Sequence, residues 1–508
     1  MLSVAWLHSW SRRSVRLPEF PFRVSQRIAN SLLIGVAVLV AGCGEQYRPV
    51  VSPVAVTQPA PQPQSYAVVT TSAGINAPGL ANVFDASGDT LLSQATLGLT
   101  PLALTLSSSA GSATTANTDG TVNSYTPSPQ LQTKNILSST LLPGAQPVNL
   151  LSTASNLFIT EPNVPAVAVF ASTTGIFNLT QQLPVPASPI NLAGNSNAAR
   201  IYSITQDNGS NQVTFGACEN PAQVTTPGQV QSIEISTITI SRTLPVGICP
   251  VYGVGSTDNN RVFILNRGSG TVTVINSQYN DLDTTANRQN LDPTTGALLL
   301  PPPSGTPVAG FNAGPVFADY FAPTSQLVTA NYDSNTITII NTSLDQFGND
   351  SPLFGQAVTV PVGNGPATLT ILRDGSRVYV ANQKDSTVSV VSLTNYKVLS
   401  TIPVTGHPIS MASTFSTPFG QIYVLASDQP YMSVIRTDTD QVAASIQLDG
   451  TGVDVHTSAQ SVAANSATTG TVANAINASH ASGAGSPCGF GARCYATTPL
   501  TTPAAHAK

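Results

Sequence analysis

A proline recurs through the middle of the chain at intervals of 42–65 residues, each time at the start of a short β-rich segment. These prolines are Pro101, Pro147, Pro189, Pro250, Pro315, Pro366 and Pro408, and Val453 occupies an eighth place. Self-similarity at such a period is typical of repeat architectures, in which each unit is one supersecondary motif. The sequence therefore predicts an array of similar units.

The clearest unit begins at Pro366. It contains four strand-like segments, at 367–372, 377–381, 387–391 and 398–404. Turn formers such as Asp374-Gly375 separate them. The third segment is echoed throughout the chain, in NVFDAS (82–87), TVNSYT (121–126), AVAVFA (166–171), QVTFGA (212–217), TVTVIN (271–276), TITIIN (336–341), TVSVVS (387–392) and MSVIRT (432–437). Each unit is thus predicted to be an antiparallel four-stranded meander.

The two ends of the repeat region complement each other. The first unit lacks its opening strand and begins at 65–72, whereas the last opening strand, 453–458, has no successor. Pairing of these segments in one blade closes a ring and removes the exposed sheet edges of an open array. The sequence therefore predicts an all-β fold: a single β-propeller over 65–458, with eight four-stranded blades by count and seven as the alternative, closed by its N- and C-terminal strands.

Tyr379-Val380-Ala381-Asn382, followed by Ser386-Thr387-Val388-Ser389-Val390, resembles the YVTN repeat of bacterial and archaeal β-propeller proteins, and 328–331 and 263–266 match it more loosely. The resemblance implies the propeller fold. Its members include surface-layer-type and cell-surface proteins, and the wider class has relatives such as lactonases. No catalytic motif of the family can be placed on this sequence, and a fold by itself does not fix an activity.

Residues 1–42 have the pattern of a signal peptide. Five arginines fall within residues 1–27, and an uninterrupted small or apolar run, too short to span a bilayer, covers 32–42. Val40-Ala41-Gly42-Cys43 resembles a bacterial lipobox, which implies a lipid on Cys43 and stable membrane anchoring. Glycine rather than aspartate follows the cysteine, which favours the outer over the inner membrane. An ordinary secretory signal with an incidental Cys43 is the alternative.

Three other segments depart from the repeat. Residues 43–64 carry the lipid-site cysteine and a Pro- and Gln-rich stretch that is predicted to be an extended tether. Residues 459–508 are low in large apolar residues and are predicted to be a disordered tail. Long insertions are predicted at 218–235 in the fourth unit and 277–308 in the fifth, and long loops often carry function.

Four cysteines remain once Cys43 is assigned to lipid: Cys218, Cys249, Cys488 and Cys494. An even number in an exported chain favours up to two disulfides. Cys488 and Cys494 are close enough in sequence to close a small loop, and Cys218 and Cys249 flank the last part of one repeat. A redox or metal role is the alternative, and the absence of a nearby histidine argues against it.

Composition excludes several classes of function. Charged residues make up 8% of the chain and the net charge is −5, so no nucleic-acid partner is predicted. Both tryptophans, Trp6 and Trp10, lie in the signal region, whereas propellers that hold a quinone cofactor, sialidase-type propellers and WD repeats rely on tryptophan motifs. No HxH, HExxH or CxxC spacing occurs, so no dedicated transition-metal site is predicted.

Calcium is the one cofactor that the sequence brings into consideration. Asp281, Asp283 and Asp292 lie in the fifth-unit insertion and offer oxygen ligands. The EF-hand spacing is absent, however, so an ordinary polar loop is the alternative reading.

The candidate ligand site is at the mouth of the central channel. His407, His456, Asp454 and Asp319 lie on or beside opening strands, which line the channel of a propeller. Such a cluster would bind a cation or a polar ligand, and the alternative is a set of solvated side chains. No catalytic residue is assigned.

These observations predict a non-catalytic binding or scaffold protein of the cell envelope. Its lipid on Cys43 would hold the ring facing the periplasm or the exterior, where its loops meet a protein or another envelope partner. The alternative is a lactonase-like hydrolase or isomerase with its site at the channel mouth. A metal held by the four channel residues would favour that alternative.

Overall fold

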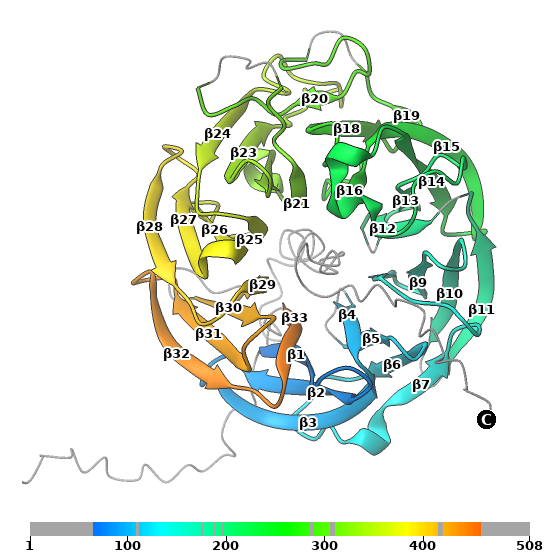
Figure 1. The fold of residues 1–508 in the computed structure, drawn as a ribbon, viewed down its shortest axis with the longest axis vertical. Coiled ribbons are helices and arrows are strands. Elements are labelled where there is room, and N and C mark those ends of the chain that lie inside the picture. The colour runs from blue at the N-terminus through cyan, green and yellow to red at the C-terminus, as the bar shows by residue number, and fades with distance from the viewer. Residues whose placement is uncertain are drawn as a thin grey trace, which may run out of the picture. The chain divides into compact units, whose positions relative to one another are not determined.

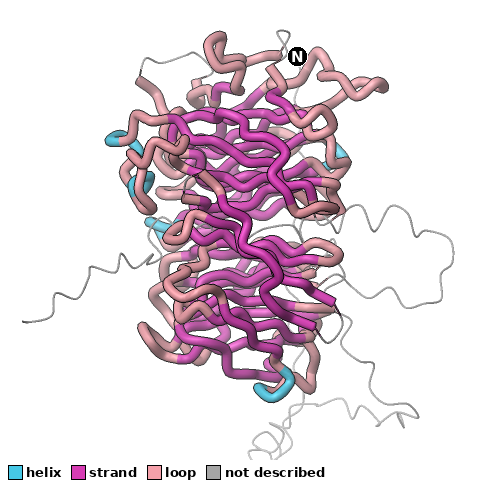
Figure 2. The backbone as a smooth tube through the Cα atoms, turned by 90° about the vertical axis from the view of Figure 1, so that its right-hand side faces the viewer, coloured by secondary structure: helices cyan, strands magenta, loops and turns pink. Residues whose placement is uncertain are grey.

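The computed structural model describes residues 65–458, apart from 108–110, 174–175, 187, 196, 285–287, 305–309 and 415–419. Within this part of the chain, eight antiparallel sheets form a ring (Figure 1). Figure 2 shows the ring edge-on, with the connecting loops gathered at its two faces. The predicted all-β propeller is therefore confirmed, with eight blades rather than seven. The signal region, Cys43, the tether, Cys488, Cys494 and the tail lie outside the described residues.

The first four blades are given from the innermost strand outward. Blade 1 contains β33 (Thr451–Thr457), β1 (Tyr66–Ser72), β2 (Pro78–Asp85) and β3 (Thr90–Leu99). Blade 2 contains β4 (Pro101–Leu106), β5 (Ala113–Asn117), β6 (Thr121–Tyr125) and β7 (Leu137–Thr140). Blade 3 contains β8 (Asn149–Ser152), β9 (Asn156–Glu161), β10 (Ala166–Thr173) and β11 (Ile176–Pro184). Blade 4 contains β12 (Pro189–Ala193), β13 (Arg200–Thr205), β14 (Pro227–Glu234) and β15 (Thr239–Ile248).

The other four blades follow the same order. Blade 5 contains β16 (Pro250–Gly255), β17 (Arg261–Asn266), β18 (Thr271–Asn276) and, in the fourth position, the short strands β19 (Asp281–Leu282) and β20 (Leu298–Leu299). Blade 6 contains β21 (Pro315–Phe321), β22 (Gln326–Asn331), β23 (Thr336–Asn341) and β24 (Ala357–Pro361). Blade 7 contains β25 (Pro366–Ile371), β26 (Arg377–Asn382), β27 (Thr387–Ser392) and β28 (Val398–Pro403). Blade 8 contains β29 (Pro408–Ser413), β30 (Gln421–Ala426), β31 (Tyr431–Arg436) and β32 (Gln441–Gln447).

Helical structure among the described residues is limited to single 3₁₀ turns. They are η1 (Thr133–Asn135), η2 (Ala217–Glu219), η3 (Pro221–Gln223), η4 (Ala322–Thr324) and η5 (Gln383–Asp385). No helix in the described ranges is long and apolar enough to cross a bilayer.

The ring is closed by its two terminal strands, as predicted. β33 pairs with β1 in antiparallel register, with His456 opposite Val68 and Asp454 opposite Thr70. The backbone N–H of Tyr66 donates to Ser458 Oγ at 2.6 Å. The last strand of the described chain thus supplies the missing innermost strand of the first blade.

The asparagine of the YVTN-like segment ties the second and third strands of its blade together. Asn382 Nδ2 donates to Thr387 Oγ1 at 3.0 Å and to Ser389 Oγ at 2.8 Å, both in the third strand of its blade. Asn266 and Asn331 make the corresponding bonds in blades 5 and 6. A Cβ on Gly363, just after the fourth strand of blade 6, would lie 2.6 Å from Asn382 atoms. The motif asparagine therefore requires glycine at the end of the preceding blade.

An aromatic residue at the third position of each of several second strands packs between neighbouring blades. Tyr379 and Tyr423 are fully buried there, and Tyr423 Oη donates to Asp89 Oδ1 of the next blade at 2.8 Å. Tyr379 Oη likewise donates to Asp440 in blade 8. Burial of the ring supplies apolar contact, and the hydroxyl fixes how one blade is set against the next.

One predicted third strand is wrong. Residues 212–217 form a loop, and the third strand of blade 4 is β14, which begins at Pro227. The Asp207 carboxylate accepts the backbone N–H groups of Asn211, Gln212 and Val213, which gives this segment a local alternative to a sheet ladder. The insertion in blade 4 therefore spans 206–226 instead of 218–235.

Candidate functional site

The innermost strands have one unpaired edge, and side chains from the preceding blade cap it. Asn149 Oδ1 accepts from the Leu192 N–H at 3.0 Å, and Asn191 Oδ1 accepts from the Gly253 N–H at 3.2 Å. These amides lie near the start of the first strands of blades 3 and 4. Because buried backbone N–H groups need an acceptor, polar residues beside the channel have a structural use.

Asp454 and His456 are brought together, and they belong to this capping system. Asp454 Oδ2 accepts from the Leu104 N–H of blade 2 at 3.3 Å, and Ser410 Oγ of blade 8 donates to Asp454 Oδ1 at 2.7 Å. His456 Nε2 lies 3.4 Å from Asp454 Oδ2. Asp454 is 1% exposed and His456 5% exposed. The pair therefore joins three blades where the ring closes.

The other two channel residues have separate partners. Asp319 Oδ2 accepts from the Ile371 N–H of blade 7 at 3.1 Å. His407, whose side chain is half-exposed, places Nδ1 2.9 Å from Asp428 Oδ2. Across the described ranges, no group of three or more His, Cys, Asp or Glu side chains is arranged to hold a metal ion.

The most elaborated part of the ring is formed by two adjacent insertions, which we call the crown. The first follows the third strand of blade 5 and includes β19 and β20, and it comprises residues 277–300 without 285–287. The second connects the third and fourth strands of blade 6 and comprises residues 342–356. Figure 1 shows these loops projecting beyond β20 and β24 at the outer edge of the ring. The first insertion was predicted from the sequence, and the second was not.

Four side chains form a buried ion network that joins the two crown insertions to blade 5. Arg261 lies 2.6 Å from Asp283 and 3.3 Å from Asp350, and Arg288 lies 2.7 Å from Asp283 and 2.5 Å from Asp350. All four side chains are at most 9% exposed. A buried network of this kind fixes geometry more than it adds stability, because desolvation offsets the attraction.

The aspartates that the sequence offers as calcium ligands have other partners in the structure. Asp283 is engaged by two arginines, and Asp281 lies 3.0 Å from Arg242 Nη2. Asp292 Oδ1 accepts from the Thr294 N–H at 2.8 Å, as in a turn. These carboxylates therefore already bind arginine side chains or backbone N–H groups.

Large apolar side chains are exposed on the crown. The described residues include eleven exposed large apolar side chains, and Tyr279, Leu299, Phe347 and Leu353 of the crown are four of them. Phe347 is 79% exposed and Tyr279 77% exposed. Because the Arg261 guanidinium donates to Gly348 O, and Gln278 donates to Asn260 Oδ1, the two turns that carry these rings flank the same part of blade 5.

A pocket of about 240 Å³ lies between blades 4 and 5 beside the crown. Its walls include Asn195, Arg200, Gly255, Asn259, Arg261 and Gln278. In an antiparallel meander the connection between strands one and two lies on the same face as the connection between strands three and four. The pocket and the crown therefore open on one face of the ring.

The charges of the pocket are neutralised in pairs. Arg200 Nε lies 2.9 Å from Glu234 Oε1, and Arg200 Nη1 donates to Ser277 O. Arg261 is paired with Asp283 and Asp350 of the crown network. Ala198, Ala199 and Val262 also line the pocket, and its amides bond to each other, as Asn195 Nδ2 does to Asn259 Oδ1 at 2.7 Å. The pocket therefore has a largely apolar wall without a strong net charge.

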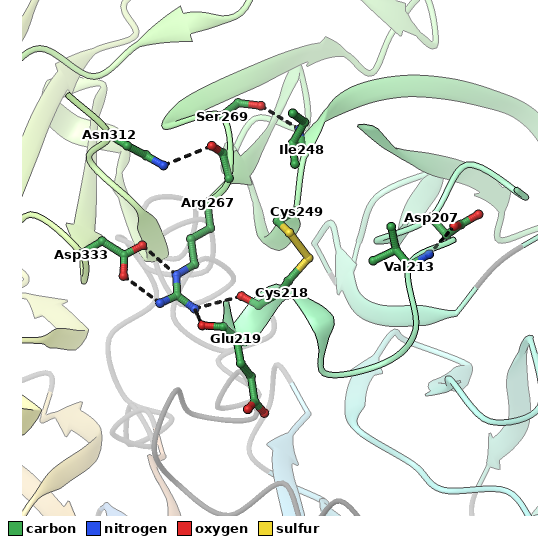
Figure 3. The surroundings of a disulfide bond; sticks show 11 residues. Asp207, Val213, Cys218, Glu219, Ile248, Cys249, Arg267, Ser269, Asn312 and Asp333 are labelled. Carbon is green, nitrogen blue, oxygen red and sulfur yellow. Dashed lines mark hydrogen bonds and ion pairs between the residues drawn. A yellow bond between two sulfur atoms is a disulfide. The ribbon is translucent and has the colours of Figure 1, made fainter. Parts of the chain in front are cut away.

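The opposite face carries a disulfide. Cys218 and Cys249 are bonded, which joins the 206–226 insertion of blade 4 to the residue before β16. Arg267 donates to Cys218 O at 3.0 Å and pairs with Asp333 of blade 6 at 2.7 Å (Figure 3). The insertion is therefore held by both a covalent bond and a buried guanidinium.

No family model matches the sequence, and no curated protein matches it. Among solved structures, apo AztD from Citrobacter koseri is similar with a TM-score of 0.52 and 11% identity, over 77% of this chain and 97% of that chain. The dihydro-heme d1 dehydrogenase NirN in complex with DHE is similar with a TM-score of 0.53 and 10% identity, over 79% of this chain and 78% of that chain. At these identities the likeness shows the fold alone, an eight-bladed β-propeller.

The second crown insertion and the pocket were not recognised from the sequence. Their residues are common polar types, and their contacts join segments far apart, such as Arg261 and Asp350. A partial signal did exist, because Pro315 and Pro366 are 51 residues apart and Pro366 and Pro408 only 42. The additional residues of the longer unit lie in NTSLDQFGNDSPLFGQ (341–356), where Phe347 and Leu353 stand among turn formers.

Proposed function

We propose that this protein is a non-catalytic binding protein of the cell envelope, in which the crown holds a protein partner. The observation that carries the proposal is the exposure of Phe347 and Tyr279 on insertions that a buried ion network fixes. Large apolar side chains that are exposed together on one part of a surface mark interaction sites. Fixed loops also lose little conformational entropy on binding, which favours recognition.

The chemistry of the crown fits a protein surface. Aromatic rings are enriched at the centres of protein interfaces, where polar rims surround them. Here Phe347 and Tyr279 stand among amides and paired charges such as Asp281 with Arg242. The described residues offer no comparable support for the lactonase-like alternative, because Asp454 and Asp319 already accept backbone hydrogen bonds from neighbouring blades.

Site-specific photo-cross-linking tests the proposal. A benzoylphenylalanine is placed at position 347 or 279 of the full chain in cells that express it, and at Leu399 on the outer strand β28 as a matched exposed control. We expect one common protein adduct from positions 347 and 279 and none from position 399. Equal adducts from all three positions, or none from the two crown positions, would contradict the proposal.

Measuring the affinity for the cross-linked partner then shows whether the crown contributes to binding or only lies close to the partner. Phe347→Ser removes an exposed ring, so we expect an unchanged melting temperature and at least about tenfold weaker binding of the cross-linked partner. Leu399→Ser serves as the control. Wild-type affinity in the Phe347→Ser variant would show that the interface does not lie on the crown.

The membrane anchor is part of the same proposal. The supporting observation is the lipobox-like Val40-Ala41-Gly42-Cys43 that follows an apolar run. A lipid on Cys43 would hold the propeller at the periplasmic or exterior side of the envelope, and the outer membrane is favoured. Metabolic labelling with an alkyne palmitate should mark the wild-type chain and not a Cys43→Ala variant. Labelling that persists in the variant would overturn the anchor.

A further inference from the structure

The sequence contains two Asn-Gly pairs, Asn208-Gly209 and Asn364-Gly365. We propose that Asn208 is a site of spontaneous deamidation, at which the carboxamide becomes a carboxylate and the insertion at 206–226 loosens. The insertion connects the second and third strands of blade 4, so it lies on the opposite face of the ring from the crown. The inference is therefore independent of the partner proposed for the crown.

The reaction needs only groups of the chain itself, together with water and hydroxide. The Gly209 nitrogen loses its proton to hydroxide, attacks Cγ of Asn208 and forms a cyclic succinimide. The Cγ–Nδ2 bond breaks, and Nδ2 leaves as ammonia with a proton from water, which restores the hydroxide. Water then opens the ring at either carbonyl and gives aspartate or isoaspartate. A glycine favours the attack because no Cβ hinders the approach of its nitrogen.

The native structure permits this reaction at Asn208. Asn208 and Gly209 are both exposed, and among the described residues none accepts a hydrogen bond from the Gly209 N–H. The Ser210 N–H donates to Asn208 Oδ1 at 3.2 Å, which folds the carboxamide back over the main chain. The same bond stabilises the negative charge that Oδ1 gains during the attack, as a donor in an oxyanion hole does.

The second Asn-Gly pair is held in a form that resists the reaction. Asn364 Nδ2 donates to Asp385 Oδ1 at 2.8 Å, and the Gly365 N–H donates to Asn335 Oδ1 at 2.9 Å. Both the leaving group and the attacking nitrogen are therefore engaged. Because the same dipeptide occupies two contrasting environments in one molecule, Asn364 is an internal control for Asn208.

Modification at Asn208 would disturb the hydrogen bonds that shape the insertion. The Asp207 carboxylate accepts the N–H groups of Gln212 and Val213, both at 2.8 Å, and Val213 is buried. Isoaspartate lengthens the main chain between Asp207 and these groups by one methylene. Both products also place a second carboxylate beside Asp207, and like charges repel at short range. The modified insertion should therefore lose its fixed form.

Ageing of the intact folded chain tests the inference, with Cys43 replaced by alanine so that the chain is soluble. Samples are kept in mildly alkaline heavy-oxygen water, and tandem mass spectrometry of peptides measures the carboxylate formed at each position. We expect conversion at Asn208 to be at least about tenfold faster than at Asn364, with heavy oxygen incorporated. In urea-unfolded chains the two rates should agree within about threefold, because the native contacts that distinguish the two pairs are lost.

Limited proteolysis follows the effect on the insertion. Cleavage within 206–226 should be faster in the aged than in the fresh wild-type chain. An aged Asn208→Gln variant should be cut as slowly as its fresh form, because glutamine would have to close a larger ring, and its melting temperature shows that it is folded.

Two results would overturn the modification site: no conversion at Asn208, or equal conversion at Asn208 and Asn364 in the folded chain. Unchanged proteolysis of the aged wild-type chain, once conversion at Asn208 has been measured, would overturn the loosening of the insertion. Faster proteolysis of the aged Asn208→Gln variant would do the same, because the change would then not depend on Asn208.

Discussion

The backbone N–H of Leu104 in blade 2 donates to the carboxylate of Asp454 in β33 at 3.3 Å, although 350 residues separate the two in sequence. The same carboxylate accepts from Ser410 Oγ of blade 8. Strand β33 therefore contributes more than its ladder with β1, because one of its side chains also connects the blades on either side.

Removal of β33 should open the ring. A chain truncated after Asp449 lacks residues 450–458, so β1 would lose its innermost partner and Asp454 would be absent. In repeat architectures stability depends on contacts between neighbouring units. We expect the melting temperature to fall by about 10 °C or more relative to a chain truncated after Ser458. Equal melting of the two truncations would refute closure as a stabilising contact.

A buried carboxyl in blade 3 should make stability depend on pH. Glu161 is fully buried at the end of β9, where blades 5, 6 and 7 have an asparagine, and desolvation raises its pKa to about 7. Since the folded state holds this proton more tightly than the unfolded state, stability is greatest below the unfolded pKa and falls as pH rises through about 7. The cost above that pH is on the order of 3 kcal/mol.

Glu161→Gln tests this effect, because an amide has no proton to lose. Calorimetry at pH 5 and pH 8 should give similar melting for variant and wild type at the lower pH and higher melting for the variant at the higher pH. The exposed Glu219→Gln serves as the control. A wild-type protein that is as stable at pH 8 as at pH 5 would contradict the prediction.

Much of the fold was predictable because its signals are local. Proline opens six of the first strands and stands two residues before a seventh, and Asn382 bonds to Thr387 only five positions along the chain. The prediction of a strand at 212–217 was wrong because of a hydrogen-bond acceptor outside the pattern. The alternation of these residues resembles a strand, but one upstream carboxylate, Asp207, satisfies their backbone N–H groups. A local pattern cannot reveal a competing hydrogen-bond acceptor.

The candidate sites were less predictable because their contacts are distant in sequence. Repeat alignment did place Asp454 and His456 beside the channel, where they contact each other. It could not reveal that His407 pairs with Asp428. It also could not pair Arg288 with Asp350, which depends on how two insertions fold against each other. Sequence patterns identify strands well, whereas contacts between loops depend on the three-dimensional arrangement of the blades.

Loss of the disulfide should free the insertion of blade 4. The Cys218–Cys249 bond joins residues 31 apart, for which chain entropy alone corresponds to about 3–4 kcal/mol. A Cys218→Ser/Cys249→Ser variant should therefore melt lower, and limited proteolysis should cut first within 206–226. Arg267→Lys is the informative comparison, since it keeps the disulfide but loses the bidentate pairing with Asp333. Identical proteolysis of wild type and double-serine variant would refute the prediction.

The ion network predicts that the crown can unfold while the ring stays closed. Asp350→Asn leaves Arg261 and Arg288 sharing one carboxylate, Asp283, and an uncompensated buried charge costs about 3–5 kcal/mol. Because both crown insertions follow the third strand of their blade, their opening does not require the inner three strands to separate. Hydrogen exchange should therefore quicken in 288–300 and 342–356 and stay unchanged in β25–β33. Asp281→Asn, whose ion pair with Arg242 is about half exposed, should have little effect. Uniformly faster exchange around the whole ring would show that the crown and the ring unfold as one unit.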